Sequence, residues 1–169
     1  VLPSVQKYWE KFFKVSKEFA VYYGFETIET PVLEFAEVFE KGIGGNTDII
    51  EHEMYTLKTK GGDFLALRPE LTAGAVRAYI ENGFFNQPQP VKFFHHGPVF
   101  RHESPQSGRY RSFHQADFDV IGESDAVTDA QVIQLIYSIL AEVGLKNLVI
   151  RINSIGDKNC WNKYRDEVK

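Results

Sequence analysis

The sequence is poor in cysteine, in long apolar runs and in excess positive charge. Its single cysteine, Cys160, cannot form a disulfide within the chain, which fits a reducing compartment. No apolar run approaches the length that spans a membrane, and no signal-peptide pattern opens the chain. The net charge is -4, so any contact with RNA or phosphate has to come from a local basic patch.

The composition is otherwise that of an ordinary globular protein. Its 169 residues suffice for one domain with a sizeable core, and 14 Phe and 8 Tyr predict an aromatic core or pocket. The chain starts without Met and ends in a charged, helix-like segment, so we expect a piece of a longer protein.

Hydrophobic spacing and turn residues predict one α+β unit whose strands mostly pair in antiparallel hairpins. The expected elements are a helix from Val5 to Tyr23 capped by Ser4 and ended by Gly24, a strand from Phe25 to Thr30, a hairpin of Glu53 to Leu57 with Phe64 to Leu67, a helix from Leu71 or Thr72 to about Asn82, a helix from Ala130 to Val143 capped by Asp125 or Thr128, a strand from Leu148 to Asn153, and a final helix from Asp157. The first helix and strand either pack only on the core or also cover a partner subunit.

The glycine-rich segment from Lys41 to Asp48 is expected to be a flexible lid or connector. It lacks the Lys-Ser/Thr ending of a phosphate-binding P-loop and does not follow the strand-to-helix context of that motif.

The stretch from Val91 to Gly122 organises the chain. Two strand-like runs flank a polar middle, Arg101 to Arg111, and this pattern predicts a hairpin with a long loop. Because strand side chains alternate, one side of the hairpin would carry Arg101, Glu103, Phe113, Gln115 and Asp119. Lone charges are costly to bury, so this set indicates a surface for a ligand with phosphates, a planar base and an amino group.

Simpler explanations exist for these residues when each is taken alone. Arg101 can hold a phosphate oxygen with two donors, or it can form a surface ion pair with Glu103 or another neighbour, worth about 0–1 kcal/mol. Arg109 and Arg111 are singly most often solvated, and an aromatic residue such as Phe113 is usually core. Glu70 and Thr72 either cap the helix that follows them or face a pocket.

The histidines do not predict a metal site. His95 and His96 are adjacent and point to opposite faces of a strand, while His102 and His114 lie on the face opposite Arg101. No cysteine lies at metal-ligand spacing, so we expect no zinc site, and packing or loop hydrogen bonds for the histidines.

Several ordered segments resemble the class II aminoacyl-tRNA synthetases, in the form of the histidyl-tRNA synthetase family. In this chain the segments VFRHE, SPQSGRYRSF and HQADFDVIG, within about 91–122, resemble motif 2 of the class. The residues that match the class pattern are Phe100, Arg101, Glu103, Arg109 and Phe113. The histidine-pocket segment resembles LRPELTA, residues 67–73. Motif 1, at about 5–34, resembles GFETIETPVLE with its preceding helix. Segments 47–57 and 153–156 also fit.

The resemblance implies a role for each matching residue. For ATP, Arg101 would hold the α-phosphate and the substrate carboxylate as the catalytic residue, Glu103 would accept from the adenine amino group, Arg109 would contact the distal phosphates and Phe113 would stack on adenine. For histidine, Glu70, Thr72 and Gln115 would receive the α-amino group, and Asp119 would face the imidazole. Leu71 and Arg101 would complete the histidine-binding set. Bacterial members usually have Glu at the position of Asp119.

The resemblance further implies a partial catalytic domain with an antiparallel sheet flanked by helices. Its parent would activate L-histidine with ATP, transfer it to tRNA(His), take Mg2+ with ATP and need no tightly bound cofactor. It would be a cytoplasmic homodimer, paired through Val5 to Pro31, with no membrane contact. The later histidine-specific segment, motif 3 and the anticodon-binding domain would lie beyond Lys169, so residues 1–169 alone are expected to be inactive or nearly so.

Two alternatives belong to other functional classes. A histidine-sensing regulatory subunit of ATP phosphoribosyltransferase shares the fold, but such a paralogue need not keep the ATP-contacting side chains that this sequence has. A protein-interaction module would leave the arginine loop as a solvated face.

Overall fold

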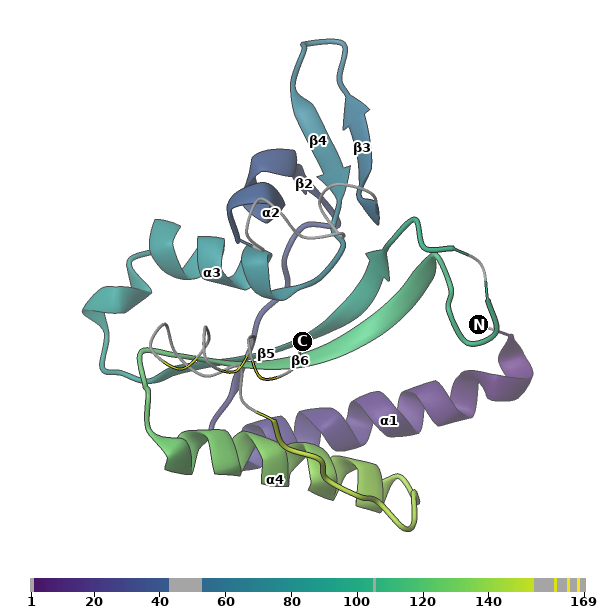
Figure 1. The fold of residues 1–169 in the computed structure, drawn as a ribbon, viewed down its shortest axis with the longest axis vertical. Coiled ribbons are helices and arrows are strands. Elements are labelled where there is room, and N and C mark those ends of the chain that lie inside the picture. Colours follow the sequence, from purple (N-terminus) through teal and green to yellow (C-terminus); the bar gives the residue numbers. More distant parts are fainter. Residues whose placement is uncertain are drawn as a thin grey trace.

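The computed structural model describes residues 2–42, 53–104 and 106–153, together with positions 160, 164 and 167. The elements follow in the order α1 (Pro3–Tyr22), β1 (Glu26–Thr27), β2 (Leu33–Phe35), α2 (Ala36–Gly42), β3 (Tyr55–Lys58), β4 (Phe64–Leu67), α3 (Thr72–Glu81), the 3-10 helix η2 (Phe84–Asn86), β5 (Val91–Phe100), β6 (Ser112–Ile121) and α4 (Ala126–Glu142) (Figure 1). Within this described part, no helix has both the length and the apolar character to cross a membrane.

Two three-stranded sheets form the framework, in the orders β1-β5-β6 and β2-β4-β3. The β5–β6 hairpin is antiparallel, with Val91 opposite Ile121 at one end and Phe100 opposite Ser112 at the other. The predicted antiparallel pairing is confirmed in both hairpins, whereas β1 runs parallel to β5. In Figure 1, α1 and α4 lie on one side of the long hairpin, and α3 with the smaller sheet lies on the other.

Side-chain alternation divides the β5–β6 hairpin into an apolar face and a polar face. Phe94 and Phe118 point to the helices and join a core with Val15 of α1 and Leu135 of α4. The alternate residues of each strand, including His95 and Asp119, point to the opposite face, toward α3. A second core lies between α2 and the small sheet, where Phe39 packs on Ala66. The apolar face therefore anchors the hairpin and leaves the other face for polar groups.

The helix ends show which capping predictions hold. The predicted Ser4 cap is wrong, because α1 begins at Pro3 with Leu2 as N-cap and no side-chain cap, and proline suits the first helical position. Gly24, at φ +77°, ends this helix as predicted. Asp125 caps α4 by accepting a hydrogen bond from the Val127 N–H, so that helix starts at Ala126 rather than Ala130. The predicted helix ending at Gly83 is confirmed as α3.

Two predicted strands are shortened or absent. Of Phe25 to Thr30, only Glu26–Thr27 form β1, and the Thr30 carbonyl accepts a hydrogen bond from Arg68 instead of joining the sheet. The segment from Leu148 to Asn153 is not a strand, since among the described residues no strand pairs with it and Val149 is 78% exposed. The expected loop beyond Gly42, the segment after Asn153 and the final helix from Asp157 fall almost wholly outside the described residues.

Candidate functional site

Arg101 leaves the end of β5 with its guanidinium fixed from two directions. Its Nε donates to the Pro69 carbonyl at 2.9 Å, and its guanidinium carbon lies 5.2 Å from the centre of the Phe113 ring. Its backbone N–H donates to the Arg111 carbonyl at 3.0 Å, which continues the β5–β6 pairing beyond the strands. Within the described residues the two terminal nitrogens of Arg101 have no hydrogen-bond partner, so both can bind an anion.

The loop that follows brings Glu103 and Arg109 to the same place. Arg109 Nη1 lies 3.4 Å from Glu103 Oε2, and the Arg109 side chain is 60% exposed whereas that of Glu103 is 14% exposed. The loop turns at Gly108, where φ is +81°, and the Arg109 N–H donates to the Gln106 carbonyl. The ion pair of Glu103 is therefore with Arg109, and the exposed arginine can leave it at little cost.

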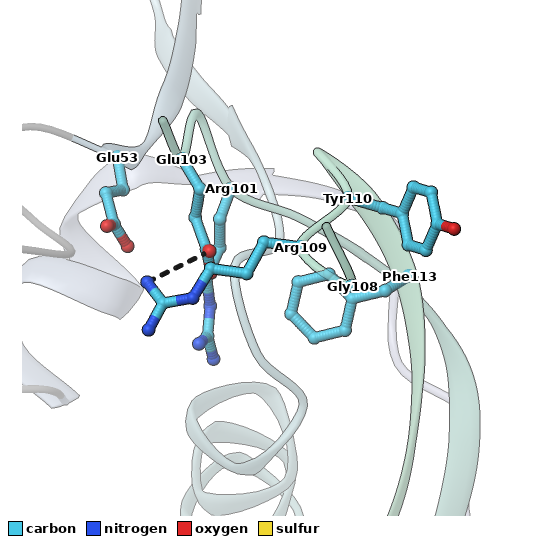
Figure 2. A pocket seen from close by; sticks show the side chains of 7 residues that line it. All are labelled: Glu53, Arg101, Glu103, Gly108, Arg109, Tyr110 and Phe113. Atoms are coloured by element: carbon cyan, nitrogen blue, oxygen red, sulfur yellow. Dashed lines mark ion pairs between the residues drawn. The ribbon is translucent and has the colours of Figure 1, made fainter. Parts of the chain in front are cut away.

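These side chains line one open pocket of about 500 Å³, drawn in Figure 2. The lining residues are Glu53, Arg101, Glu103, Gly108, Arg109, Tyr110 and Phe113. Figure 2 shows Arg109 crossing toward Glu103, while the Tyr110 ring points away from the arginines. Glu53 arrives from the segment before β3, where its carbonyl accepts from the His102 N–H at 2.7 Å.

A second group of polar side chains lies further along the same face, beside the start of α3. Both Glu70 oxygens accept backbone N–H groups, from Thr72 at 2.6 Å and Ala73 at 2.7 Å, so Glu70 caps this helix. The Thr72 hydroxyl donates to Asp119 Oδ1 at 3.2 Å, and His95 Nε2 lies 2.7 Å from Asp119 Oδ2. Helix capping thus places Glu70 and Thr72 against β6.

Two further β6 side chains on this face carry unusual features. Gln115 lies opposite Gly97, and its Oε1 is buried without a hydrogen-bond partner among the described residues. Burial raises the pKa of Asp117 from 3.8 to about 6, with Asp119 and Glu70 adding to the rise and His95 and Arg101 opposing it. Unpaired or weakly ionised buried groups of this kind concentrate at binding sites.

Arg68 holds the two groups of side chains in register. Its buried guanidinium donates from Nε to the Pro98 carbonyl at 2.9 Å and from Nη1 to the Thr30 carbonyl at 2.6 Å. Its own carbonyl accepts from the Phe100 N–H at 3.0 Å. The segment from Arg68 to Glu70 is consequently tied to β5, and this fixes the start of α3 beside the hairpin.

The structure thus places four of the predicted ATP residues around one pocket and four predicted histidine residues along the neighbouring stretch of sheet. Leu71 differs, because its side chain is fully buried in the interior. Sequence reasoning missed Glu53, Arg68 and His95, whereas strand alternation predicted the face of Asp117 but gave that residue no role. For His95 the parity of the strand was an available signal, since it shares a face with Asp117 and Asp119.

Three further histidines in the described part of the chain pack against aromatic rings, in line with the packing predicted for them. His96 stacks on Phe13 at 4.3 Å and His114 lies 4.8 Å from Trp9, both on the helix side of the sheet. His102 meets Tyr55 edge-on at 5.5 Å. In the part of the chain that the structure describes, no group of three or more His, Cys, Asp or Glu side chains has metal-binding geometry.

Comparison with known proteins finds relatives along the whole chain. The family model described as histidyl-tRNA synthetase matches residues 1–156. The histidine–tRNA ligase of Halothermothrix orenii is 44% identical over 169 residues, which are 100% of this chain and 40% of that protein. That of Bacillus licheniformis is 44% identical over 167 residues, covering 98% of this chain and 39% of the relative. The chain therefore spans about 40% of the length of the curated relatives it matches.

Solved structures show the same fold. Apo histidyl-tRNA synthetase of S. aureus superposes with a TM-score of 0.80 at 34% identity, over 98% of this chain and 38% of that one. A protein described as an ATP phosphoribosyltransferase regulatory subunit/histidyl-tRNA synthetase from Bacillus halodurans C gives 0.71 at 26% identity, over 86% and 36%. The fold agrees with the predicted α+β class. Because the family model matches residues 1–156, the chain belongs to the histidyl-tRNA synthetase family.

Proposed function

We propose that the intact protein activates histidine with ATP and transfers the histidyl group to tRNA(His), and that this chain supplies the ATP-facing hairpin and much of the histidine pocket. The observation that carries the proposal is the fixed guanidinium of Arg101. Pro69 holds its Nε and Phe113 supports its plane, beside Glu103 and Arg109 in one pocket. This arrangement suits a nucleotide phosphate next to a base.

The proposed reaction needs no nucleophilic side chain. A carboxylate oxygen of histidine attacks the α-phosphorus of ATP, the bond from that phosphorus to pyrophosphate breaks, and histidyl-adenylate forms. The free terminal nitrogens of Arg101 would bind the α-phosphate and the attacking carboxylate, and stabilise the charge that grows between them. ATP would enter as its Mg2+ complex, so the metal is part of the substrate.

The other pocket residues would recognise the rest of ATP. The Phe113 ring lines the pocket with Arg101 over it and would stack on adenine. Glu103 would accept a hydrogen bond from the adenine amino group. Arg109, which is largely exposed, would exchange Glu103 for the distal phosphates, since an arginine–phosphate contact with two donors is stronger than an exposed ion pair.

The neighbouring stretch would hold histidine. The unpartnered buried oxygen of Gln115 is suited to an ammonium group, and Glu70 and Thr72 lie beside it at the helix start. Asp119 would accept from the imidazole, a group with both a donor and an acceptor that apolar side chains lack. Histidine would thus lie along β6 with its carboxylate toward Arg101.

The proposal includes a cytoplasmic homodimer paired through Val5 to Pro31. The support is the exposure of apolar and aromatic side chains on α1, where Tyr8, Val21 and Tyr22 are more than half exposed. Sedimentation of the intact protein should return a dimer, and V21E should shift it toward monomer. A wild-type monomer would contradict this part of the proposal.

Histidine-dependent exchange between pyrophosphate and ATP tests the central claim. We expect the intact wild-type protein to catalyse the exchange and R101A to lose about 100-fold or more in rate, as when one preorganised donor to a developing charge is removed. Arg151, an exposed arginine far along the chain, gives the matched control R151A, which should retain activity. Wild-type protein without exchange would contradict the proposal.

A second candidate is a histidine-sensing regulatory subunit of ATP phosphoribosyltransferase. This candidate is supported by the shared fold of the Bacillus halodurans protein, which is described as an ATP phosphoribosyltransferase regulatory subunit/histidyl-tRNA synthetase. A sensor would bind histidine without ATP, whereas the present pocket combines two arginines, a glutamate and an aromatic ring suited to a nucleotide. Calorimetric titration of the intact protein with ATP in the presence of histidine separates the two, because only the enzyme should bind it.

A further inference from the structure

We propose that His95 is a positioning residue of the histidine pocket, which fixes the Asp119 carboxylate in the orientation that receives the imidazole of the substrate. The inference rests on the proposed function and extends it to a residue to which the family resemblance assigned no role. His95 lies in the middle of β5, and its side chain is 2% exposed. Among the described residues its polar side-chain contact is with Asp119, so we infer that its effect passes through that carboxylate.

The geometry shows how Asp119 is held. His95 lies directly opposite Asp117 and diagonally across the two strands from Asp119, a distance that a long side chain bridges. Its Nε2 donates to Asp119 Oδ2 at 2.7 Å. Thr72, from the start of α3, donates to the other oxygen at 3.2 Å. Donors from two different elements thus fix both oxygens of one carboxylate.

This arrangement leaves acceptor capacity for a ligand. Each carboxylate oxygen has about two lone-pair sites, so one site on each Asp119 oxygen remains after the bonds from Thr72 and His95. Because the carboxylate cannot turn without breaking one of these bonds, its remaining sites have fixed directions. A fixed acceptor costs less entropy on binding than a mobile one.

Several charges lie near Asp117 and Asp119 on this face. Burial raises the pKa of Asp117 to about 6, the charges of Asp119 and Glu70 add to the rise, and His95 and Arg101 oppose it. Because neighbouring carboxylates repel one another, the hydrogen bonds from Thr72 and His95 help to hold the Asp119 carboxylate in place.

A purely structural role accounts less well for His95. Its Nδ1 is buried and has no hydrogen-bond partner among the described residues. A buried unpaired polar atom is destabilising, and an aromatic residue without ring nitrogens would avoid that cost. The strand neighbours Phe93 and Phe94 show that such residues fit this sheet. The polar ring is therefore explained by its bond to Asp119.

Two amide substitutions test whether the side chain at position 95 has to reach Asp119 or only has to be polar. In H95Q the amide nitrogen is as far from Cβ as Nε2 is in histidine, whereas in H95N it lies near the position of Nδ1 and cannot reach Asp119. We expect H95N in the intact protein to raise KM for histidine about 10- to 100-fold, the value of a hydrogen bond to a charged group. KM for ATP should stay within about twofold, and H95Q should recover most of the loss.

The control is H96N, the adjacent residue on the helix side of the sheet, which should leave both KM values unchanged. KM does not depend on the folded fraction, so a loss of stability alone would not produce the expected pattern. Equal KM for histidine in H95N and wild type would overturn the proposal, as would equal losses in H95N and H95Q. Histidine affinities measured by calorimetry test the role of His95 independently of catalysis. They remain informative even if the wild-type protein catalyses no exchange, which is the result that contradicts the proposed function.

Discussion

Gly97 provides the space that the guanidinium of Arg68 occupies. A Cβ atom added at Gly97 would overlap Arg68 Nη2, and the arginine lies buried there with hydrogen bonds to the Thr30 and Pro98 carbonyls. Gly97 also lies opposite Gln115 in the hairpin. One missing side chain on β5 therefore admits the cation that ties the start of α3 to the sheet.

We expect G97A to lower the free energy of unfolding by about 2–4 kcal/mol, because the added methyl group displaces a buried charged group from its acceptors. Urea unfolding of the intact protein followed by circular dichroism measures this change. Gly61 offers a matched control, since a Cβ there meets only ordinary contacts of 3.5 and 3.6 Å. Similar stability in G97A and G61A would contradict the expectation.

Removing the Gln115 amide should weaken the binding of histidine more than the binding of ATP. Its Oε1 is buried without a hydrogen-bond partner among the described residues, and Gln115 lies further along β6 than Phe113. We expect Q115A to raise KM for histidine about tenfold, the order of one hydrogen bond to an ammonium group, with little effect on KM for ATP. Pyrophosphate exchange with each substrate varied in turn gives both values. Equal losses would show that Gln115 serves the fold instead.

Glu103 should matter for nucleotide choice and little for stability. Its ion pair with Arg109 joins a largely exposed arginine at 3.4 Å, so E103A should change the free energy of unfolding by less than about 1 kcal/mol. We expect the same variant to raise KM for ATP and to reduce the preference for ATP over GTP, because the acceptor for the adenine amino group is lost. Competition between the two nucleotides in the exchange assay measures the preference. An unchanged preference would leave Glu103 with the ion pair alone.

Asp117 should make the protein less stable as the pH rises through about 6. Its pKa in the folded chain lies above the usual 3.8, so the folded state binds this proton more tightly than the unfolded state does. The stabilising contribution is full below pH 3.8 and is lost as the pH rises through 6. We expect D117N to be more stable than wild type at pH 8 by about 1–3 kcal/mol, with a smaller difference at pH 4. Urea unfolding at both pH values tests this, and a difference independent of pH would refute it.

His96 should have the opposite dependence. Burial, followed by the charge of His114, lowers the pKa of His96 below 6.5, so the folded state binds fewer protons at that group than the unfolded state. Its contribution to stability is full above pH 6.5 and decreases as the pH falls below that value. We expect H96F, which keeps a ring against Phe13, to lose less stability than wild type between pH 7.5 and 5.5. Thermal unfolding at the two pH values provides the comparison, and parallel losses would exclude a role for His96.

Much of the site followed from strand alternation. The parity of β5 and β6 predicted that Arg101, Phe113, Gln115 and Asp119 share a face, and the apolar residues between them fill the other face. This inference needs only the two-residue repeat of a strand and a hairpin connection. The cap at Asp125 and the helix ends at Gly24 and Gly83 likewise depend on local chemistry.

The features that the sequence did not predict correctly have a different physical origin. The segment from Leu148 to Asn153 alternates as a strand does, but a strand forms only where another backbone pairs with it, and among the described residues none does. The contacts of Arg68 join residues that are 30 and 38 positions apart in sequence. Such contacts depend on how two sheets and a helix meet, which a local pattern cannot specify.

The sequence by itself determined which residues face one another across the hairpin and which motifs they form, because side-chain direction follows from backbone periodicity. Only the tertiary structure decided which partners they meet: that Glu103 pairs with Arg109, that the Thr72 hydroxyl donates to Asp119, and that His95 reaches Asp119. The reason is that a hydrogen bond depends on the register and separation of elements, which are set by packing of the whole chain.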